Sequence, residues 1–211
     1  MADAAGLSGL LLAGGGSVRM CRDKTARDFL FQGESLAARV AHRLAEACDD
    51  VLVASGDGAR MGWLGLPQVA DEVPESGPLG GLVAGVGRAP HQLVAAVAAD
   101  MPFASPPLLR LLASLADGVD AVLPVDDRGL EPLHAVYARS AGPGLRRALR
   151  TGRLAIRDAL QGLRVRLVEP AEWRVTDPTG RFAWNVNAPE DLKGEPGRGA
   201  ATSFEEPPGP H

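Results

Sequence analysis

Apolar residues along this chain alternate between short continuous runs and stripes with helical spacing. A short apolar run that ends at glycines is typical of a buried strand, and residues 7–13 (LSGLLLA) are the first such run. Residues 35–48 (SLAARVAHRLAEAC) are instead typical of an amphipathic helix. Leu36, Val40 and Leu44 lie on one stripe of that helix, and Ser35 is a good N-cap.

The same patterns continue to the end of the chain. The predicted strands are Leu7–Ala13, Val51–Ala54, Leu93–Ala99, Ala121–Val125, Leu133–Ala138, Val165–Val168 and Phe182–Val186. The predicted helices are Ser35–Cys48, one that starts near Gly77 and Pro78, Pro106–Ala116, Gly144–Arg150, Leu154–Gln161 and a last one that starts over Ala188–Leu192. The stretch from Ala54 to Pro74 has the composition of a loop.

Strands that alternate with helices and are apolar on both faces predict an α/β fold. Its central sheet would be mainly parallel and covered by helices on two sides. Ligands of such folds bind at the carboxyl ends of the strands. The loops expected at that edge of the sheet follow Ala13, Ala54, Ala99 and Val186.

Composition narrows the class of protein. The 211 residues, 45% of them hydrophobic, suffice for one globular domain, expected over residues 1–193, with a disordered Pro- and Gly-rich tail over residues 194–211. A net charge of −4 does not favour a nucleic-acid surface. Cys21 and Cys48 have no metal or redox spacing. The N-terminal segment lacks the pattern of a signal peptide or a membrane helix, so a cytoplasmic protein is expected.

The glycine-rich stretch LLAGGGSVRMCRDK, residues 11–24, indicates an anion-binding loop. It is not a Walker A motif, which would need glycines at Val18 and Asp23, nor a dinucleotide fingerprint, which would need one at Arg19. Its glycines let the backbone approach an anion, and Arg19 and Lys24 could neutralise a triphosphate. The alternative is a glycine turn followed by solvated charges.

Acids and asparagines supply the other candidate groups. Asp100 ends a buried apolar run, and a lone carboxylate there suits Mg²⁺ held jointly with substrate phosphates, although it could instead cap the next helix. Asp71 precedes a Gly-Pro turn, where a plain surface loop is an equal alternative. Asn185 and Asn187 would share one face of a strand, which suggests polar recognition, unless Asn187 caps the last helix. The four histidines do not have the spacing of metal ligands, and the sequence contains no G-x-S-x-G motif of a serine nucleophile.

Several of these segments match one family in order and approximate spacing. They are Leu12–Lys24, Asp71, Gly77–Gly81 (GPLGG), Ala98–Phe103 (AADMPF), Glu131–Ser140 (EPLHAVYARS) and Trp184–Leu192 (WNVNAPEDL). Together they resemble the molybdenum cofactor guanylyltransferase family over roughly residues 6 to 192. The resemblance implies a three-layer, Rossmann-like nucleotidyltransferase fold over residues 1–193. It also implies transfer of GMP from GTP to the phosphate of molybdopterin, with release of pyrophosphate.

The resemblance also assigns roles to individual residues. Backbone contacts to guanine and ribose are implied at Leu12, Ala13 and Gly14. Triphosphate contacts are implied at Gly15, Arg19 and Lys24. Asp71 would contact the nucleotide, Asp100 would hold Mg²⁺, and Asn185 and Asn187 would lie near the reacting phosphates or the molybdopterin. The catalytic residues would be Arg19, Lys24 and Asp100.

The implied substrates are GTP and molybdopterin or the molybdenum cofactor, and the implied protein partners are cofactor-inserting proteins and molybdoenzymes. Binding to nucleic acid or to a membrane is not expected. The protein would be a monomer. Two alternatives stay open. One is a cytidylyltransferase or another nucleotidyltransferase of the same superfamily, and the other is a non-catalytic homologue that binds GTP or the cofactor.

Three departures from the family pattern stand out in the sequence. Cys21 replaces a glycine, and the stretch after Lys24 is longer than usual. After Val53 the family often has an asparagine that contacts the base, whereas residues 54–57 (ASGD) contain none.

Overall fold

The computed structural model describes residues 6–14, 30–31, 33–186 and 191. The predicted helix that starts over Ala188–Leu192 and the predicted tail over residues 194–211 lie outside these ranges, apart from residue 191. No helix among the described residues is long and apolar enough to cross a membrane.

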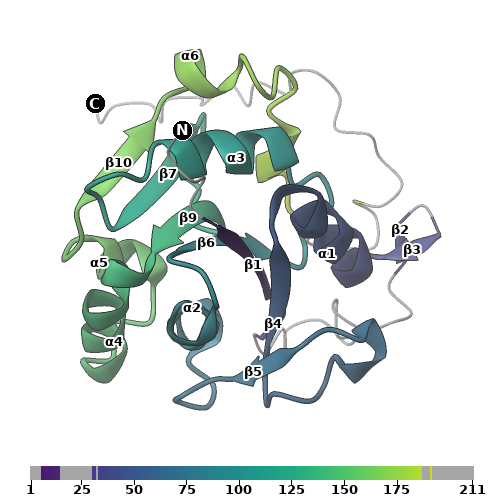
Figure 1. Ribbon diagram of the computed structural model, residues 1–211, viewed down its shortest axis with the longest axis vertical. Helices are drawn as coiled ribbons and strands as arrows, with labels where there is room; N and C mark the ends of the chain where they lie inside the picture. The colour runs from purple at the N-terminus through teal and green to yellow at the C-terminus, as the bar shows by residue number, and fades with distance from the viewer. Residues whose placement is uncertain (1–5, 15–29, 32, 187–190, 192–211) are drawn as a thin grey trace, which may run out of the picture.

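Eight strands of the described chain form one sheet. They are β1 (Leu7–Leu12), β4 (Asp50–Gly56), β5 (Gln68–Ala70), β6 (Leu93–Ala98), β7 (Ala121–Asp126), β8 (Gly129–Leu130), β9 (His134–Ala138) and β10 (Val165–Val168). The spatial order is β10-β7-β9-β6-β1-β4-β5, and β8 pairs with β7 at the side (Figure 1). A separate hairpin joins β2 (Leu30–Phe31) to β3 (Glu34–Ser35).

The sheet is mainly parallel, as the alternation of elements predicts. All pairings from β6 through β1 and β4 to β5 are parallel, and so is the pairing of β7 with β10. Strands β9 and β8 are the exceptions. Strand β9 runs antiparallel to both β6 and β7, and β8 runs antiparallel to β7. Only residues 127–133 separate β7 from β9, which is too short for the crossover that a parallel neighbour requires.

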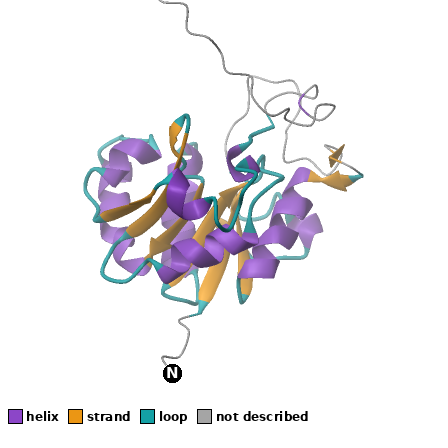
Figure 2. Ribbon diagram, turned by 90° about the horizontal axis from the view of Figure 1, so that it is seen from above, coloured by secondary structure: helices purple, strands orange, loops and turns teal. Residues whose placement is uncertain are grey.

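Helices cover both faces of the sheet. The α-helices are α1 (Leu36–Ala47), α2 (Gly77–Arg88), α3 (Pro106–Ser114), α4 (Gly142–Arg150), α5 (Ile156–Leu160) and α6 (Pro170–Trp173), and the 3-10 helices are η1 (Gly62–Leu64), η2 (Arg139–Ala141) and η3 (Arg181–Ala183). Figure 1 shows α1 and α3 on one side of the strands and α2, α4 and α5 on the other, and Figure 2 shows helices on both sides of the sheet. The predicted α/β architecture with three layers is confirmed.

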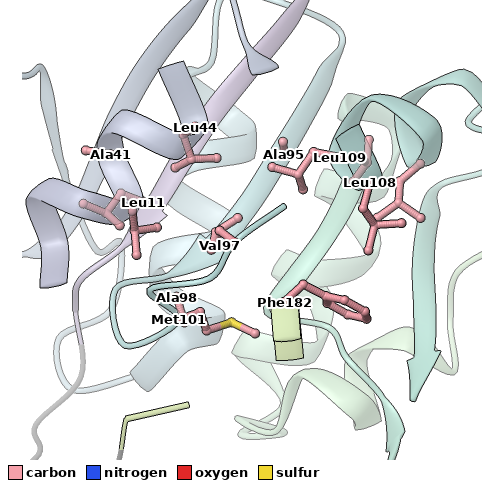
Figure 3. Packing of buried hydrophobic residues seen from close by; sticks show 14 of the residues in the cluster. Leu11, Ala41, Leu44, Ala95, Val97, Ala98, Met101, Leu108, Leu109 and Phe182 are labelled. Atoms are coloured by element: carbon pink, nitrogen blue, oxygen red, sulfur yellow. The ribbon is translucent and has the colours of Figure 1, made fainter. Parts of the chain in front are cut away.

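Alternating side chains of the central strands build two cores. Leu11 and Val97 point towards α1 and α3, where they pack in the cluster that contains Leu44 and Leu108 (Figure 3). Leu10, next to Leu11 along β1, packs in the other cluster under α2, α4 and α5. Burial on both faces explains why these strands are continuous apolar runs in the sequence.

Helix α2 approaches the sheet closely because one of its faces is small. A Cβ added at Gly81 would lie 3.0 Å from Cβ of Ala54 and 3.2 Å from Cδ2 of Leu12. A larger residue there would push the helix away from the ends of β1 and β4. This packing brings the N-terminal end of α2 to the edge where these strands end.

The structure contradicts two of the predicted elements. Phe182–Val186 is not a strand, since η3 occupies residues 181–183 and residues 184–186 have no regular structure. Gly180, at a φ of 62°, turns the chain into η3, and Phe182 then packs its ring on Trp173 and His134 instead of joining a ladder. The predicted loop between Ala54 and Pro74 contains η1 and the short edge strand β5.

Candidate functional site

The carboxyl ends of three neighbouring strands meet at one edge of the sheet. Leu12 at the end of β1 is in register with Ala54 of β4 and with Ala98 of β6. The ladders extend one residue further, because the amide of Ala13 donates to the Ala54 carbonyl (2.9 Å) and the amide of Ala99 to the Leu12 carbonyl (3.0 Å). The loops after Ala13, Ala54 and Ala99 therefore share one edge, as predicted.

Gly14 begins the first of these loops and lies against the backbone of β4. A Cβ at this position would be 3.0 Å from the amide nitrogen of Gly56 and 3.3 Å from its Cα. Such contacts are tighter than nearly all real Cβ contacts, so a side chain here would push the backbone of Gly56 away by a few tenths of an ångström. Glycine is thus the residue that allows the present close approach of the two chains.

Asp71 follows β5 and presents a carboxylate at the same edge. Its amide donates to the Gly56 carbonyl (2.9 Å), and a Cβ at Gly80 in the first turns of α2 would lie 3.0 Å from its Oδ2. Its Oδ1 is buried and accepts no hydrogen bond from the described residues. Burial raises the pKa of the carboxyl, and the charge of Arg60 opposes that rise. A buried acceptor without a donor is costly, so this oxygen needs a donor from outside the described residues.

Arg60 is a site residue that the sequence did not reveal. Oδ1 of Asp57 accepts hydrogen bonds from the amides of Ala59 (2.9 Å) and Arg60 (2.8 Å), which turns the loop after β4 back towards β1. These two amides hold the pKa of Asp57 below its usual range. The guanidinium of Arg60 then donates to the carbonyl of Ala13 (Nη2 to O, 2.7 Å). Nothing in the spacing of the sequence distinguishes Arg60 from the chain's many other arginines.

Asp100 lies half-buried directly after β6, where the sequence predicts it. Its carbonyl accepts the amide of Val186 (2.8 Å), so the chain at Val186 returns to this edge. The loop predicted after Val186 lies outside the described residues, apart from residue 191. Among the described residues no three His, Cys, Asp or Glu side chains gather into a metal site. Mg²⁺ usually takes one or two carboxylates together with substrate phosphates and water, and a single carboxylate at a strand end suits that arrangement.

Asn185 is half-buried next to Val186 and so lies beside the Asp100 loop, but not on a strand. Aromatic contacts hold this segment. Trp184 packs on Phe103 with ring centroids 5.2 Å apart, and the guanidinium of Arg181 lies 3.7 Å from the centroid of the Phe103 ring. The predicted strand at Asn185 is wrong, because residues 184–186 have no regular structure and are held by side-chain packing, not by pairing with a neighbouring strand.

The structure thus brings Leu12, Ala13, Gly14, Asp71, Asp100 and Asn185 to one edge. The other predicted site residues lie outside the described ranges: Gly15, Arg19, Lys24 and Asn187. Cys21 and the stretch that follows Lys24 up to residue 29 also lie outside them.

His134, from the EPLHAVYARS segment, supports the loop that follows Asp100. It is fully buried, and its Nε2 accepts the amide of Ser105 (3.0 Å). Burial lowers the pKa of the imidazole to about 4, so the folded protein keeps it neutral.

We expect His134 to make stability depend on pH. The unfolded chain, with a histidine pKa near 6.5, binds more protons than the folded chain between about pH 4 and pH 6.5. Stability from this group is complete above about pH 6.5 and is lost towards pH 4, by about 3 kcal/mol in all. Urea unfolding at pH 7, 5.5 and 4.5 measures the loss, and His134→Gln should reduce it. An equal pH dependence in both proteins would contradict this role.

Comparisons with known proteins agree with this architecture. Residues 9–169 match the model of the MobA-like NTP transferase domain. A probable molybdenum cofactor guanylyltransferase of Chloroflexus aggregans is 38% identical over 193 residues, covering 89% of this chain and 92% of the relative. The molybdenum cofactor guanylyltransferase of Desulfosudis oleivorans is 32% identical over 189 residues, covering 89% and 93%.

Solved structures place the chain in the same group. The crystal structure of molybdopterin-guanine dinucleotide biosynthesis protein A from Archaeoglobus fulgidus superposes with a TM-score of 0.75 at 26% identity, covering 89% of this chain and 95% of the other. A cytidylyltransferase of Thermus thermophilus that acts on 2-C-methyl-D-erythritol 4-phosphate shares the fold, with a TM-score of 0.63 at 18% identity over 87% and 94% of the two chains. The chain therefore carries the MobA-like NTP transferase domain and belongs to the molybdenum cofactor guanylyltransferase family.

Proposed function

We propose that this protein transfers GMP from GTP to the phosphate of molybdopterin, forming molybdopterin guanine dinucleotide and releasing pyrophosphate. The observation that carries the proposal is the edge where β1, β4, β5 and β6 end. There the carboxylate of Asp100 follows β6, the close glycine contact joins the ends of β1 and β4, and Asp71 follows β5 with a buried oxygen that accepts no hydrogen bond from the described residues. The family relationship supplies the reaction, and this edge supplies groups that suit it.

In the proposed reaction an oxygen of the molybdopterin phosphate attacks the α-phosphorus of GTP, and the bond from that phosphorus to the β-phosphate oxygen breaks. The nucleophile is already an anion, so the protein needs no side chain to activate it. Positioning and charge neutralisation are then the main catalytic requirements. Arg19 and Lys24 would contact the triphosphate with Gly15, a role that rests on the sequence motif.

Mg²⁺ is the cation we propose at Asp100, where one carboxylate at a strand end suits a metal shared with phosphates. When bound, it would neutralise charge on the phosphate oxygens. Asp100 would hold and orient it, while Asn185 and Asn187 would contact the acceptor or the reacting phosphates. The lone acid and its place after β6 support this assignment.

Leu12, Ala13 and Gly14 would line the nucleoside. The amide of Ala13 already donates a hydrogen bond to the Ala54 carbonyl, and the carbonyl of Ala13 accepts one from Arg60. Contacts from Ala13 to a nucleoside would therefore pass through the second lone pair of that carbonyl or through the arginine bound to it.

The proposal is tested by incubating the protein with Mg²⁺, molybdopterin and each nucleoside triphosphate in turn, and identifying the product by mass. We expect a GMP adduct of molybdopterin and pyrophosphate when the nucleoside triphosphate is GTP, and no adduct with the other three. A CMP adduct would instead indicate a cytidylyltransferase. GTP binding without turnover would indicate a non-catalytic homologue. A cytoplasmic location, a monomeric state, and cofactor-inserting proteins and molybdoenzymes as partners stay predictions from the sequence.

A further inference from the structure

A cavity lies between α1, the start of α3 and the turn that leads into η3. Its volume is about 400 Å³, within the range of roughly 300–1,000 Å³ that small-molecule sites occupy. Helices α1 and α3 cover the same face of the sheet, so the cavity belongs to that face (Figure 1). Its wall beside α3 includes Phe103 and Ser105, from the loop that leaves the sheet at Asp100. The proposed transfer of GMP gives this cavity no role.

Two arginines line the cavity from different elements, Arg43 on α1 and Arg181 at the start of η3. The Nε of each is buried and has no hydrogen-bond acceptor among the described residues. Within the same residues Arg43 makes one long side-chain hydrogen bond, from Nη1 to Oε2 of Glu46 (3.5 Å), and the side chain of Arg181 makes none. Buried donors without acceptors cost free energy, so both side chains would gain from a ligand that supplies acceptors.

The two acids that line the cavity already have partners in their own segments. Glu46 accepts from Arg43, which lies one turn earlier along α1. Oδ1 of Asp177 accepts the hydroxyl of Thr179 (2.6 Å) and the amides of Thr179 (3.2 Å) and Gly180 (3.3 Å). These bonds close the turn that leads into η3. The acids therefore brace two walls of the cavity, whereas the guanidinium groups keep donors for a ligand.

Phe103 restrains the guanidinium of Arg181, whose Cζ lies 3.7 Å from the centroid of the ring. Contact with an aromatic face stabilises the cation and leaves the N–H groups at its edge available to an anion. An arginine restrained in this way loses less conformational entropy when it binds. Phe103 and the two prolines that begin α3 also give the cavity an apolar wall, which suits the organic part of a ligand.

We propose that the cavity binds a small organic molecule that carries a phosphate group, with Arg43 and Arg181 donating to the phosphate oxygens and Phe103 contacting the organic part. Arginine pairs strongly with phosphate, and a tetrahedral phosphate offers acceptors to donors from two different walls. The inference goes beyond the proposed function. Under that function the reacting phosphates meet at the strand edge near Asp100, so this ligand is a third one, separate from GTP and molybdopterin.

Calorimetry with phenyl phosphate tests the inference, because this probe joins one phosphate to one aromatic ring. The wild type should bind it. Arg43→Met and Arg181→Met should each weaken binding by about 10- to 100-fold, the usual effect of losing one hydrogen bond between charged groups. Arg43→Lys, which keeps the charge but loses the planar fork, should fall between the wild type and Arg43→Met.

Two further probes distinguish the chemistry of the ligand. Inorganic phosphate lacks the ring, and benzoate carries a carboxylate in place of the phosphate, so both should bind more weakly than phenyl phosphate. Inorganic phosphate that binds as tightly as phenyl phosphate would contradict the organic part of the ligand. Benzoate that binds as tightly would contradict the phosphate group.

Arg147→Met is the matched control, because Arg147 is an exposed arginine on α4, which covers the opposite face of the sheet (Figure 1). It should bind phenyl phosphate as the wild type does. Thermal unfolding would check that each variant is folded, and Arg43→Met alone decides if loss of the Phe103 contact unfolds Arg181→Met. Arg43→Met should also keep the wild-type KM for GTP and for molybdopterin.

A wild type that does not bind phenyl phosphate would overturn the inference. Equal binding by the wild type and the folded variants would also overturn it, since the probe would then bind elsewhere. A raised KM for molybdopterin in Arg43→Met would overturn it as well, because the cavity would then hold the acceptor of the transfer. Absence of GMP transfer by the wild type would remove the proposed function but leave the calorimetric result standing.

Discussion

Asp100→Asn should lower guanylyl transfer by about 10²- to 10³-fold while leaving the fold intact. The substitution keeps the size of the side chain but removes the negative charge that would hold a divalent cation on the triphosphate. Loss of such preorganised charge stabilisation at a reacting phosphate commonly costs two to three orders of magnitude in rate. Among the described residues no group of three or more His, Cys, Asp and Glu side chains forms an alternative metal site.

The measurement is the rate of GMP transfer at saturating GTP, with the magnesium concentration varied. Asp127→Asn is the matched control, since Asp127 is an exposed acid in the turn between β7 and β8. It should keep the wild-type rate and the wild-type response to magnesium. A rate of Asp100→Asn within tenfold of the wild type would show that the cation, if it is required, is held elsewhere.

The elements that the sequence predicts best are those decided by local physics. Ser35 caps α1 by accepting the amide of Ala38 (3.3 Å), and β10 has the predicted bounds, Val165–Val168. Both follow from residues that are close neighbours in the chain. Segment β5 has only three residues, none of them fully buried, at the edge of the sheet, so its apolar pattern is too weak to predict a strand.

The segment from Phe182 to Val186 shows the opposite failure. Its residues alternate between large apolar and other side chains, as a strand would. The period of two arises instead from separate aromatic contacts, with Phe182 on Trp173 and Trp184 on Phe103. A strand needs an adjacent strand to pair with, and the local pattern carries no information about whether one is available.

The candidate site also contains residues that the sequence predicts and residues that it does not. Asp100 could be predicted because a charged residue that ends a buried run must lie at a strand end in an α/β fold. Arg60 could not, because its contact to Ala13 joins residues 47 positions apart and depends on the turn that Asp57 forms. Contacts made by long side chains across loops leave no periodic signal in the sequence.

Gly14→Val should weaken the use of GTP by about 100-fold in kcat/KM. The Cβ alone would lie 3.0 Å from the amide nitrogen of Gly56 and would shift that backbone by a few tenths of an ångström, and the two methyl groups of valine need further room. Displacing groups that position a substrate by about 1 Å can cost on the order of 10²-fold in rate. The same separation should lower the free energy of unfolding by about 1–3 kcal/mol, the usual cost of overpacking.

Three variants measured for both kcat/KM and urea unfolding would establish the cause. Gly14→Ala adds the Cβ alone, so it should fall between the wild type and Gly14→Val. Gly162→Ala is the control, because the nearest atom to a Cβ there is 3.9 Å away, in the turn before β10. A loss of stability in Gly14→Val without a loss in kcat/KM would mean that the close contact of β1 and β4 serves packing only. Loss of both, graded with side-chain size, would tie the glycine to the placement of the nucleotide.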